Sequence, residues 1–194
     1  MTTKSTVSQD DLWLNPSILL KANNTSKEPK YMISSTRLCL KPFTSADADE
    51  CYACITPTLT KYMSWDPPQD QNAFESIWRT WLITIQDESD WVFVIRDQLN
   101  DEFLGLVGFH QAKQSRPELG IWIREDRHGF AYGKEAVTAI ADWASRHFNF
   151  EAFIYPVAIE NYASCRIAES LNGTPIYCSQ QAKYKSVTYL IPKI

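Results

Sequence analysis

Residues 118–136 read ELGIWIREDRHGFAYGKEA, and this stretch decides the fold of the chain. Its apolar part, residues 119–123, indicates a strand, and a basic turn that contains glycine follows, leading to a helix that we expect to begin near Gly133 or Lys134. The first amides of a helix lack partners inside it, the helix dipole is positive there, and glycine lets an anion approach the backbone. The sequence therefore predicts a phosphate-binding turn over residues 127–134.

Length and composition are typical of one folded domain, which we expect over residues 31–194 after an N-terminal extension, residues 1–30. The chain has 194 residues, of which 44% are hydrophobic and 22% charged, so it can bury a full core. A net charge of −4 argues against nucleic-acid binding, which usually requires a basic face. Residues 1–11 lack the apolar segment of a signal peptide, and no apolar run approaches the roughly 20 residues of a membrane span. We expect a cytoplasmic monomer or homodimer that binds neither nucleic acid nor membrane.

The cysteines do not form a recognisable framework. There are five of them, an odd number, and only Cys51 and Cys54 have the spacing of a redox or zinc pair. No second pair of cysteines or histidines lies nearby in the sequence, so we expect buried, reduced thiols and no metal.

Periodicity predicts an α/β domain with a mixed sheet. Apolar and polar residues alternate over residues 36–42, as in a half-buried strand, and three further strands follow one another as an antiparallel meander after residue 90. Helical spacing places Phe74, Trp78 and Trp81 on one apolar face. The expected strands cover residues 36–42, 91–96, 103–110, 118–124, 152–159, 176–179 and 184–191, and the expected helices follow Thr44 and Pro68 and cover residues 134–147 and 161–171.

One strand carries a proline at its centre. Pro156 lies in the middle of residues 152–159 and has no N–H to donate to a neighbouring strand. We therefore expect this strand to be bulged, to lie at an edge, or to splay away from a neighbour at that point.

Three motifs follow one another in a fixed order. They are the strand at residues 119–123, GFAYGKEA at residues 129–136 and NYASCRIAESLNG at residues 161–173, within a resemblance that begins at RLCLKPF, residues 37–43, and extends to about Ile191. Together they resemble the GNAT superfamily of acetyl-CoA-dependent N-acetyltransferases, in particular the branch that acetylates ribosomal-protein N-termini. The positions that match the motifs of this branch are Gly129, Ala131, Glu135, Ala136, Asn161, Ser164 and Gly173.

The turn departs from the family pattern at one position. Three residues before its first glycine the family often has Gln or Arg, whereas this chain has Asp126. A carboxylate beside a pyrophosphate is unfavourable unless the side chain points away.

The resemblance implies a fold and a donor substrate. The fold is a mixed, mostly antiparallel twisted sheet flanked by helices, with two central parallel strands that splay apart and admit the thioester of acetyl-CoA; we place Pro156 at this splay. Backbone at Ile121 and Ile123 could pair with the pantetheine arm, and Arg127, Lys134 or Arg166 could meet the 3′-phosphate. The expected coenzyme contacts are Ile121, Ile123, Arg127, His128, Gly129, Phe130, Ala131, Tyr132, Gly133, Lys134, Asn161 and Ser164.

Acyl transfer to an amine requires a base for the amine proton and an acid for the departing thiolate. The resemblance places Ser164 near the coenzyme sulfur as the acid, and Asn161 on the pantetheine. Glu118 is our expected base, directly or through water, with His110 and Asp66 as competitors. The expected acceptor pocket contains Tyr62, Trp65, Asp66 and His110.

The acceptor itself stays open between a protein α-amine, a polyamine, an aminoglycoside and an amino-acid-like metabolite. The main alternative function is a non-catalytic acyl-CoA-binding or regulatory module on the same fold. A dinucleotide-binding fold is disfavoured, because no G-x-G-x-x-G occurs and an antiparallel meander precedes the turn.

Overall fold

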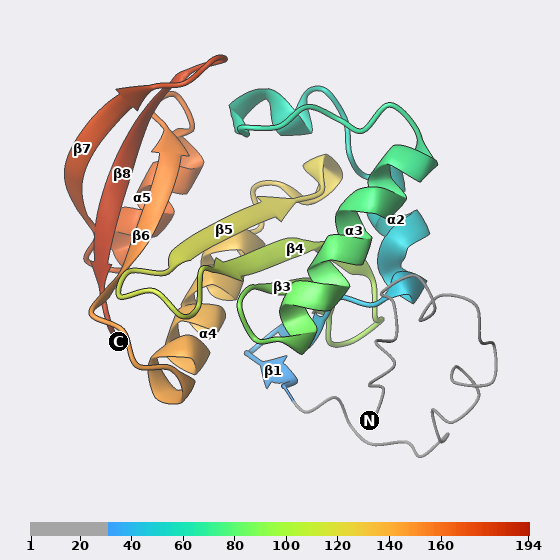
Figure 1. Cartoon of the computed structure of the whole chain (residues 1–194), viewed down its shortest axis with the longest axis horizontal. Coiled ribbons are helices and arrows are strands. Elements are labelled where there is room, and N and C mark those ends of the chain that lie inside the picture. Colours follow the sequence, from blue (N-terminus) through green and yellow to red (C-terminus); the bar gives the residue numbers. More distant parts are fainter. Residues whose placement is uncertain (1–30) are drawn as a thin grey trace, which may run out of the picture. The chain divides into compact units, whose positions relative to one another are not determined.

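An eight-stranded mixed sheet organises residues 31–194, the part of the chain that the computed structural model describes (Figure 1). The strand order is β1-β2-β3-β4-β5-β6-β8-β7, and every neighbouring pair is antiparallel except β5 and β6. The expected fold class is therefore confirmed, while the extension expected over residues 1–30 lies outside the described residues. The strands are β1 (Ile33–Ser34), β2 (Leu38–Pro42), β3 (Trp91–Asp97), β4 (Phe103–His110), β5 (Glu118–Ile123), β6 (Ala152–Ala158), β7 (Thr174–Gln180) and β8 (Lys185–Pro192).

Helices cover both faces of this sheet. The alternation of side chains along β3 explains the two layers, because Val92 and Val94 pack on one face, with Phe74, while Trp91 and Phe93 pack on the other. Helices α2 and α3 belong to the first layer, and α4 and α5 to the second. The helices are α2 (Ala48–Ala53), α3 (Gln71–Gln86), α4 (Tyr132–His147) and α5 (Tyr162–Ser170), with short 3₁₀ turns η2 (Ser45–Asp47), η3 (Leu59–Tyr62) and η4 (Glu125–Arg127).

The central strands β5 and β6 separate soon after they meet. Their parallel pairing is limited to Glu118 opposite Ile154, whose N–H donates to Pro117 O at 2.9 Å. Two residues further along β6, Pro156 faces the same side and has no N–H, so the splay leaves no unpaired donor there. The ladder from β6 to β8 stays continuous from Ala152 to Ala158. The splay is thus confirmed and lies on the β5 side alone.

Cys51 and Cys54, the two cysteines with the spacing of a redox or zinc pair, are free thiols. Cys51 is buried, and burial raises the pKa of its thiol, while Cys54 is half-buried. Between residues 31 and 194, no three His, Cys, Asp or Glu side chains gather as a metal site would require. Over the same residues, no helix combines the length and apolarity needed to cross a bilayer.

Candidate active site

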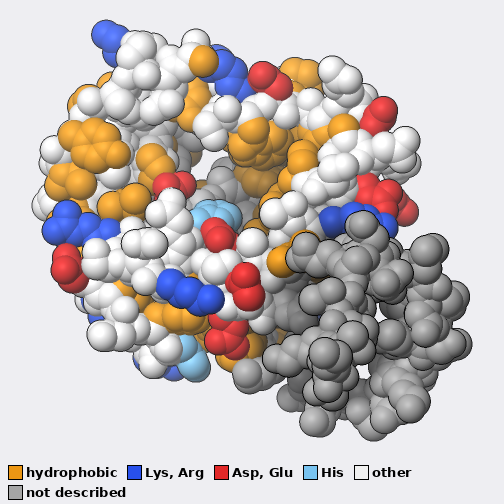
Figure 2. Space-filling view, in the orientation of Figure 1, with side chains coloured by type: hydrophobic (Ala, Val, Ile, Leu, Met, Phe, Trp, Pro, Cys, Tyr) orange, Lys and Arg blue, Asp and Glu red, His pale blue; other side chains and the backbone are white. Residues whose placement is uncertain are grey.

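A cleft of about 820 Å³ lies beside the splay, and Figure 2 shows this face of the molecule hollowed, with hydrophobic side chains around the opening. Its walls come from β4, β5 and β6, from the start of α5, from the η3–α3 segment and from the β7–β8 turn. Residues expected in three different roles therefore line one space. From the predicted set, the cleft is lined by Tyr62, Trp65, Asp66, His110, Glu118, Ile121, Asn161 and Ser164.

Of the remaining predicted residues, Ile123 ends β5, and the others lie beyond it, where the chain turns into α4. The backbone is left-handed at Gly129, with φ of 86°, and at Ala131, with φ of 63°. Within the described part of the chain, none of the backbone N–H groups of residues 129–134 donates to an acceptor. Six unpaired donors at the positive end of a 16-residue helix form a site for an anion. A Cβ at Gly129 would meet nothing within 4 Å, so space is open beside these amides.

An ion pair between Arg37 and Glu135 holds this turn in place. Glu135, in the first turn of α4, accepts hydrogen bonds of 2.8 Å from Ser35 Oγ and from both the N–H and Nε of Arg37. The Arg37 guanidinium also donates to Phe130 O at 3.1 Å and lies 4.6 Å from the centre of the Tyr132 ring. Burial opposes ionisation of Glu135, but the bonds from Ser35 and Arg37 outweigh it and lower the pKa of this carboxyl. The first strands of the sheet thereby fix the amides of the turn.

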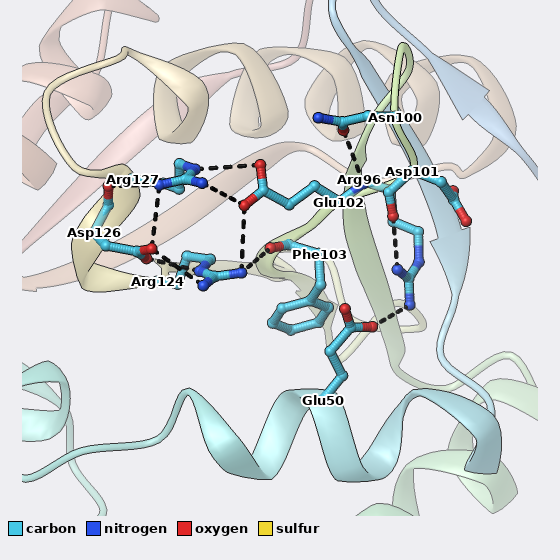
Figure 3. A network of polar contacts seen from close by, with 9 residues as sticks. All are labelled: Glu50, Arg96, Asn100, Asp101, Glu102, Phe103, Arg124, Asp126 and Arg127. Carbon is cyan, nitrogen blue, oxygen red and sulfur yellow. Dashed lines mark hydrogen bonds and ion pairs between the residues drawn. The ribbon is translucent and has the colours of Figure 1, made fainter.

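The unexpected acidic residue of the turn is neutralised by its neighbours. Asp126 accepts hydrogen bonds from Arg124 Nε at 2.7 Å and from Arg127 Nη1 at 3.2 Å (Figure 3). The hydrogen bond from Arg124 is the largest cause that lowers the pKa of Asp126. Arg127 also donates to Glu102 at 2.6 Å. Of the three cations that the sequence offers for a phosphate, Arg127 is therefore the one whose guanidinium already has partners within the protein.

The other predicted polar contacts, His128, Lys134 and Arg166, differ in whether their side chains have partners within the protein. His128 Nε2 lies 2.7 Å from Ile123 O, so that ring braces the end of β5. Lys134 and Arg166 are exposed, and neither side chain has an ion pair or hydrogen bond among residues 31–194. These two cations, rather than Arg127, are free to meet a phosphate.

The edge of β5 that faces the splay is open at Ile121. Arg124 donates its N–H to Leu104 O on β4 at 2.9 Å. Because antiparallel pairing alternates, the backbone of Ile121 and Ile123 points away from β4, toward the side that β6 has left. Ile121 can therefore pair with an extended ligand, as an added strand would.

A tyrosine that the sequence did not single out contacts Ser164. Tyr155 OH lies 2.7 Å from Ser164 Oγ, and the Tyr155 side chain is 2% exposed. Burial raises the pKa of Tyr155, so its hydroxyl keeps its proton. Asn161 Oδ1 accepts from Ser164 N at 3.2 Å and caps α5, while its amide nitrogen has no partner within the described chain. Only the pairing of β6 with α5 brings the two hydroxyls together, so no local pattern could have revealed them.

On the opposite wall, Glu118 and His110 are cross-strand neighbours. Burial raises the pKa of Glu118, and its side chain makes no hydrogen bond or ion pair with any of residues 31–194. His110 Nδ1 lies 3.2 Å from Asp90 Oδ1, and this hydrogen bond is the main cause that lowers the pKa of Asp90. The imidazole lies across two glycines, since a Cβ at Gly108 would come within 2.1 Å of Nε2 and one at Gly120 within 3.4 Å.

Asp66, the third candidate base, is engaged elsewhere. Its carboxylate is 2.9 Å from Lys183 Nζ, and its side chain is 80% exposed. Lys183 also donates to Thr60 O at 3.1 Å and to Trp65 O at 2.7 Å. These three contacts tie the β7–β8 turn to η3 and to the segment after it, so Asp66 is held in an ion pair at the exposed edge of the cleft.

Comparisons with known proteins agree on the fold. The family profile of the acetyltransferase (GNAT) domain matches residues 37–174. A structure of the ribosomal L7/L12 α-N-protein acetyltransferase RimL in complex with coenzyme A is similar, with a TM-score of 0.73 and 17% identity, over 84% of this chain and 98% of that one. Spermidine N-acetyltransferase from Vibrio cholerae, in complex with CoA and spermine, gives a TM-score of 0.71 and 15% identity, over 82% and 97%. No curated protein sequence matches the chain.

Proposed function

This chain belongs to the GNAT acetyltransferase family, and we propose that residues 31–194 transfer the acetyl group of acetyl-CoA to a primary amine by direct attack within a ternary complex. Enzymes of this family use acetyl-CoA, which supplies a thioester carbonyl open to attack by the amine. One observation carries the proposal. A half-buried carboxylate at Glu118 that has no partner among residues 31–194 and the Tyr155–Ser164 hydroxyl pair line the same cleft, with Glu118 on β5 and Tyr155 on β6, the two strands that splay apart.

The unpaired groups of the chain fit the coenzyme. The amides of residues 129–134 would hold the pyrophosphate at the α4 N-terminus, and the exposed Lys134 or Arg166 would meet the 3′-phosphate. The open backbone of Ile121 and the free amide nitrogen of Asn161 would bind the pantetheine arm. Each of these donors lacks a partner among residues 31–194, which is what a site for an external ligand requires.

The amine must lose a proton as its nitrogen bonds to the acetyl carbon. Glu118 is the group that we assign to this step, directly or through one water, because its burial raises its pKa toward the working range of a base. His110 is the second candidate, since its Nδ1 is bonded to Asp90 while its Nε2 lies over Gly108 and Gly120. Asp66 is the weakest candidate because Lys183 neutralises it.

The carbon–sulfur bond breaks as the new bond forms, and the departing thiolate takes one proton. Ser164 is the residue that we assign to donate it, with Tyr155 positioning the Ser164 hydroxyl through their 2.7 Å hydrogen bond. Burial raises the pKa of Tyr155, so Tyr155 keeps its own proton. The amine proton taken by Glu118 passes to solvent and a proton from solvent in the cleft restores Ser164, so the step is balanced.

The test is the release of free coenzyme A, measured with a thiol reagent, together with the mass of the acetylated amine. We expect Ser164→Ala and Glu118→Gln each to lower kcat by about 10²-fold or more. Ser170→Ala and Glu151→Gln, both at exposed positions outside the cleft, are the matched controls and should retain the activity. Tight binding of acetyl-CoA without turnover of any amine would instead favour a non-catalytic acyl-CoA-binding module.

Retained turnover in either active-site variant would remove that residue from the mechanism. If Glu118→Gln stays active while His110→Gln is inactive, the base is His110.

A further inference from the structure

The charge of the cleft is set by very few groups. Its lining, which lies within residues 31–194, includes no lysine or arginine, and its carboxylates are Glu118 and Asp66. Asp66 is neutralised by Lys183 at 2.9 Å. One uncompensated carboxylate, Glu118, therefore faces the cleft, and it matches a ligand with a single positive charge.

The wall around Glu118 is apolar and rich in rings. Trp65 lines the cleft, is 38% exposed and, among the described residues, stacks on no other aromatic ring. Trp81 from α3 and Trp122 from β5 also line the cleft, together with apolar side chains such as Leu59. These rings favour a flat apolar body, because peptide groups packed against them would lose their hydrogen bonds to water on entry.

Contacts of Lys183, which we call the strap, join two segments at the mouth of the cleft. Lys183 binds Thr60 O, Trp65 O and Asp66 Oδ1, so the β7–β8 turn is tied to the segment after η3. The next residue, Tyr184, lines the cleft, and its pKa is raised by burial and then by the charge of Glu118. This tie restrains two segments that line the cleft, which hinders a polypeptide more than a small molecule.

We propose that the acceptor is a small primary monoamine with an aromatic or similarly flat apolar body. This inference rests on the proposed acetyl transfer and deepens it by naming the class of acceptor. A polyamine fits less well, because its second ammonium would find no free carboxylate in the lining. A peptide N-terminus fits less well, because of the strap and the apolar walls.

The experiment measures kcat/KM, by coenzyme A release, for 2-phenylethylamine, spermidine and a short peptide with a free N-terminal serine. The full chain and saturating acetyl-CoA are used throughout. We expect 2-phenylethylamine to exceed both other amines at least about tenfold, which is the discrimination that one buried group can give. Equal or faster turnover of spermidine or the peptide would overturn the monoamine inference and leave acetyl transfer standing. Binding of acetyl-CoA with no turnover of any amine would overturn acetyl transfer itself.

Variants locate the acceptor within the cleft. Trp65→Ala should raise KM for 2-phenylethylamine about 2- to 10-fold, the size of one aromatic contact, with KM for acetyl-CoA unchanged. Tyr184→Leu is a second ring variant at a separate position. Lys183→Ala should raise the turnover of the peptide relative to 2-phenylethylamine by opening the strap, and Lys185→Ala, on the same hairpin, is its control. An unchanged KM in both ring variants would contradict the aromatic wall.

Discussion

The hydrogen bond between Tyr155 and Ser164 permits a quantitative prediction with two readouts. Tyr155 is 2% exposed, and Ser164 Oγ, at 2.7 Å, is the only partner of its hydroxyl among the described residues. Ser164→Ala therefore leaves a buried phenol without a partner, and the free energy of unfolding should fall by about 1–3 kcal/mol. Tyr155→Phe should cost less, about 1 kcal/mol or below, because the half-buried Ser164 hydroxyl can turn to water in the cleft.

The double variant separates the hydrogen bond from the two side chains. Removing both hydroxyls leaves neither one unsatisfied, so its loss should be smaller than the sum of the single losses by about 1–2 kcal/mol. Urea unfolding followed by tryptophan fluorescence gives these energies, provided that the m-value is the same in all four proteins. Single losses that add to within about 0.3 kcal/mol would show that the two hydroxyls are not paired in solution.

Activity provides the second readout. If the pair supplies the thiolate proton, Ser164→Ala should lower kcat about 10²-fold, and adding Tyr155→Phe should lower it little further, because residues that act as a unit are not additive. KM for acetyl-CoA should change little in any of these variants. Full activity in Ser164→Ala would refute the proton-donor role even if the stability coupling is found.

Three further predictions concern the base and the coenzyme turn. Burial raises the pKa of Glu118, and only the carboxylate accepts a proton, so kcat/KM should rise as the pH rises through this pKa, and the rise should be absent in Glu118→Gln. The folded chain also holds the proton of Glu118 to higher pH than the unfolded chain does. The free energy of unfolding should therefore fall between the unfolded and the folded pKa of Glu118, in the wild type alone. Lys134→Gln should raise KM for acetyl-CoA about fivefold at low salt and less at high salt, as for an exposed charge beside a phosphate, and equal KM values at low salt would contradict the contact. Arg37→Gln should release the turn and raise KM for acetyl-CoA about 3- to 10-fold with kcat retained, as the loss of a charged hydrogen bond implies. The control is Arg116→Gln, since Arg116 is an exposed arginine paired with Glu151.

Much of the fold follows from local patterns. The meander from β3 to β5, helix α4 and the glycine turn were all expected within a few residues of their observed bounds, because apolar periodicity and glycine act over neighbouring positions. Pro156 also predicted a disruption of β6, since the missing N–H is a property of the residue itself. The sequence could not choose between a bulge, an edge and a splay, because that depends on which strand lies alongside.

The active-site contacts that sequence reasoning missed join residues that are distant along the chain. Asp90 and His110 are 20 residues apart and meet only because β3 pairs with β4, while Lys183 and Asp66 are 117 residues apart. The position of the His110 ring over Gly108 and Gly120 likewise depends on the register of β4 against β5. No periodicity records such a register, which comes from the packing of the whole sheet.

By itself, the sequence determined the order of the strands and helices, the turn of free amides before α4 and the family to which the chain belongs, because these depend on local backbone preferences and short motifs. Only the tertiary structure decided which charges are free to bind. It paired Arg127 and Arg124 with Asp126 and Glu102, and left Lys134 and the half-buried Glu118 without a partner among residues 31–194. Charges act through space over a few ångströms, so their partners are chosen by the packed fold and not by their position along the chain.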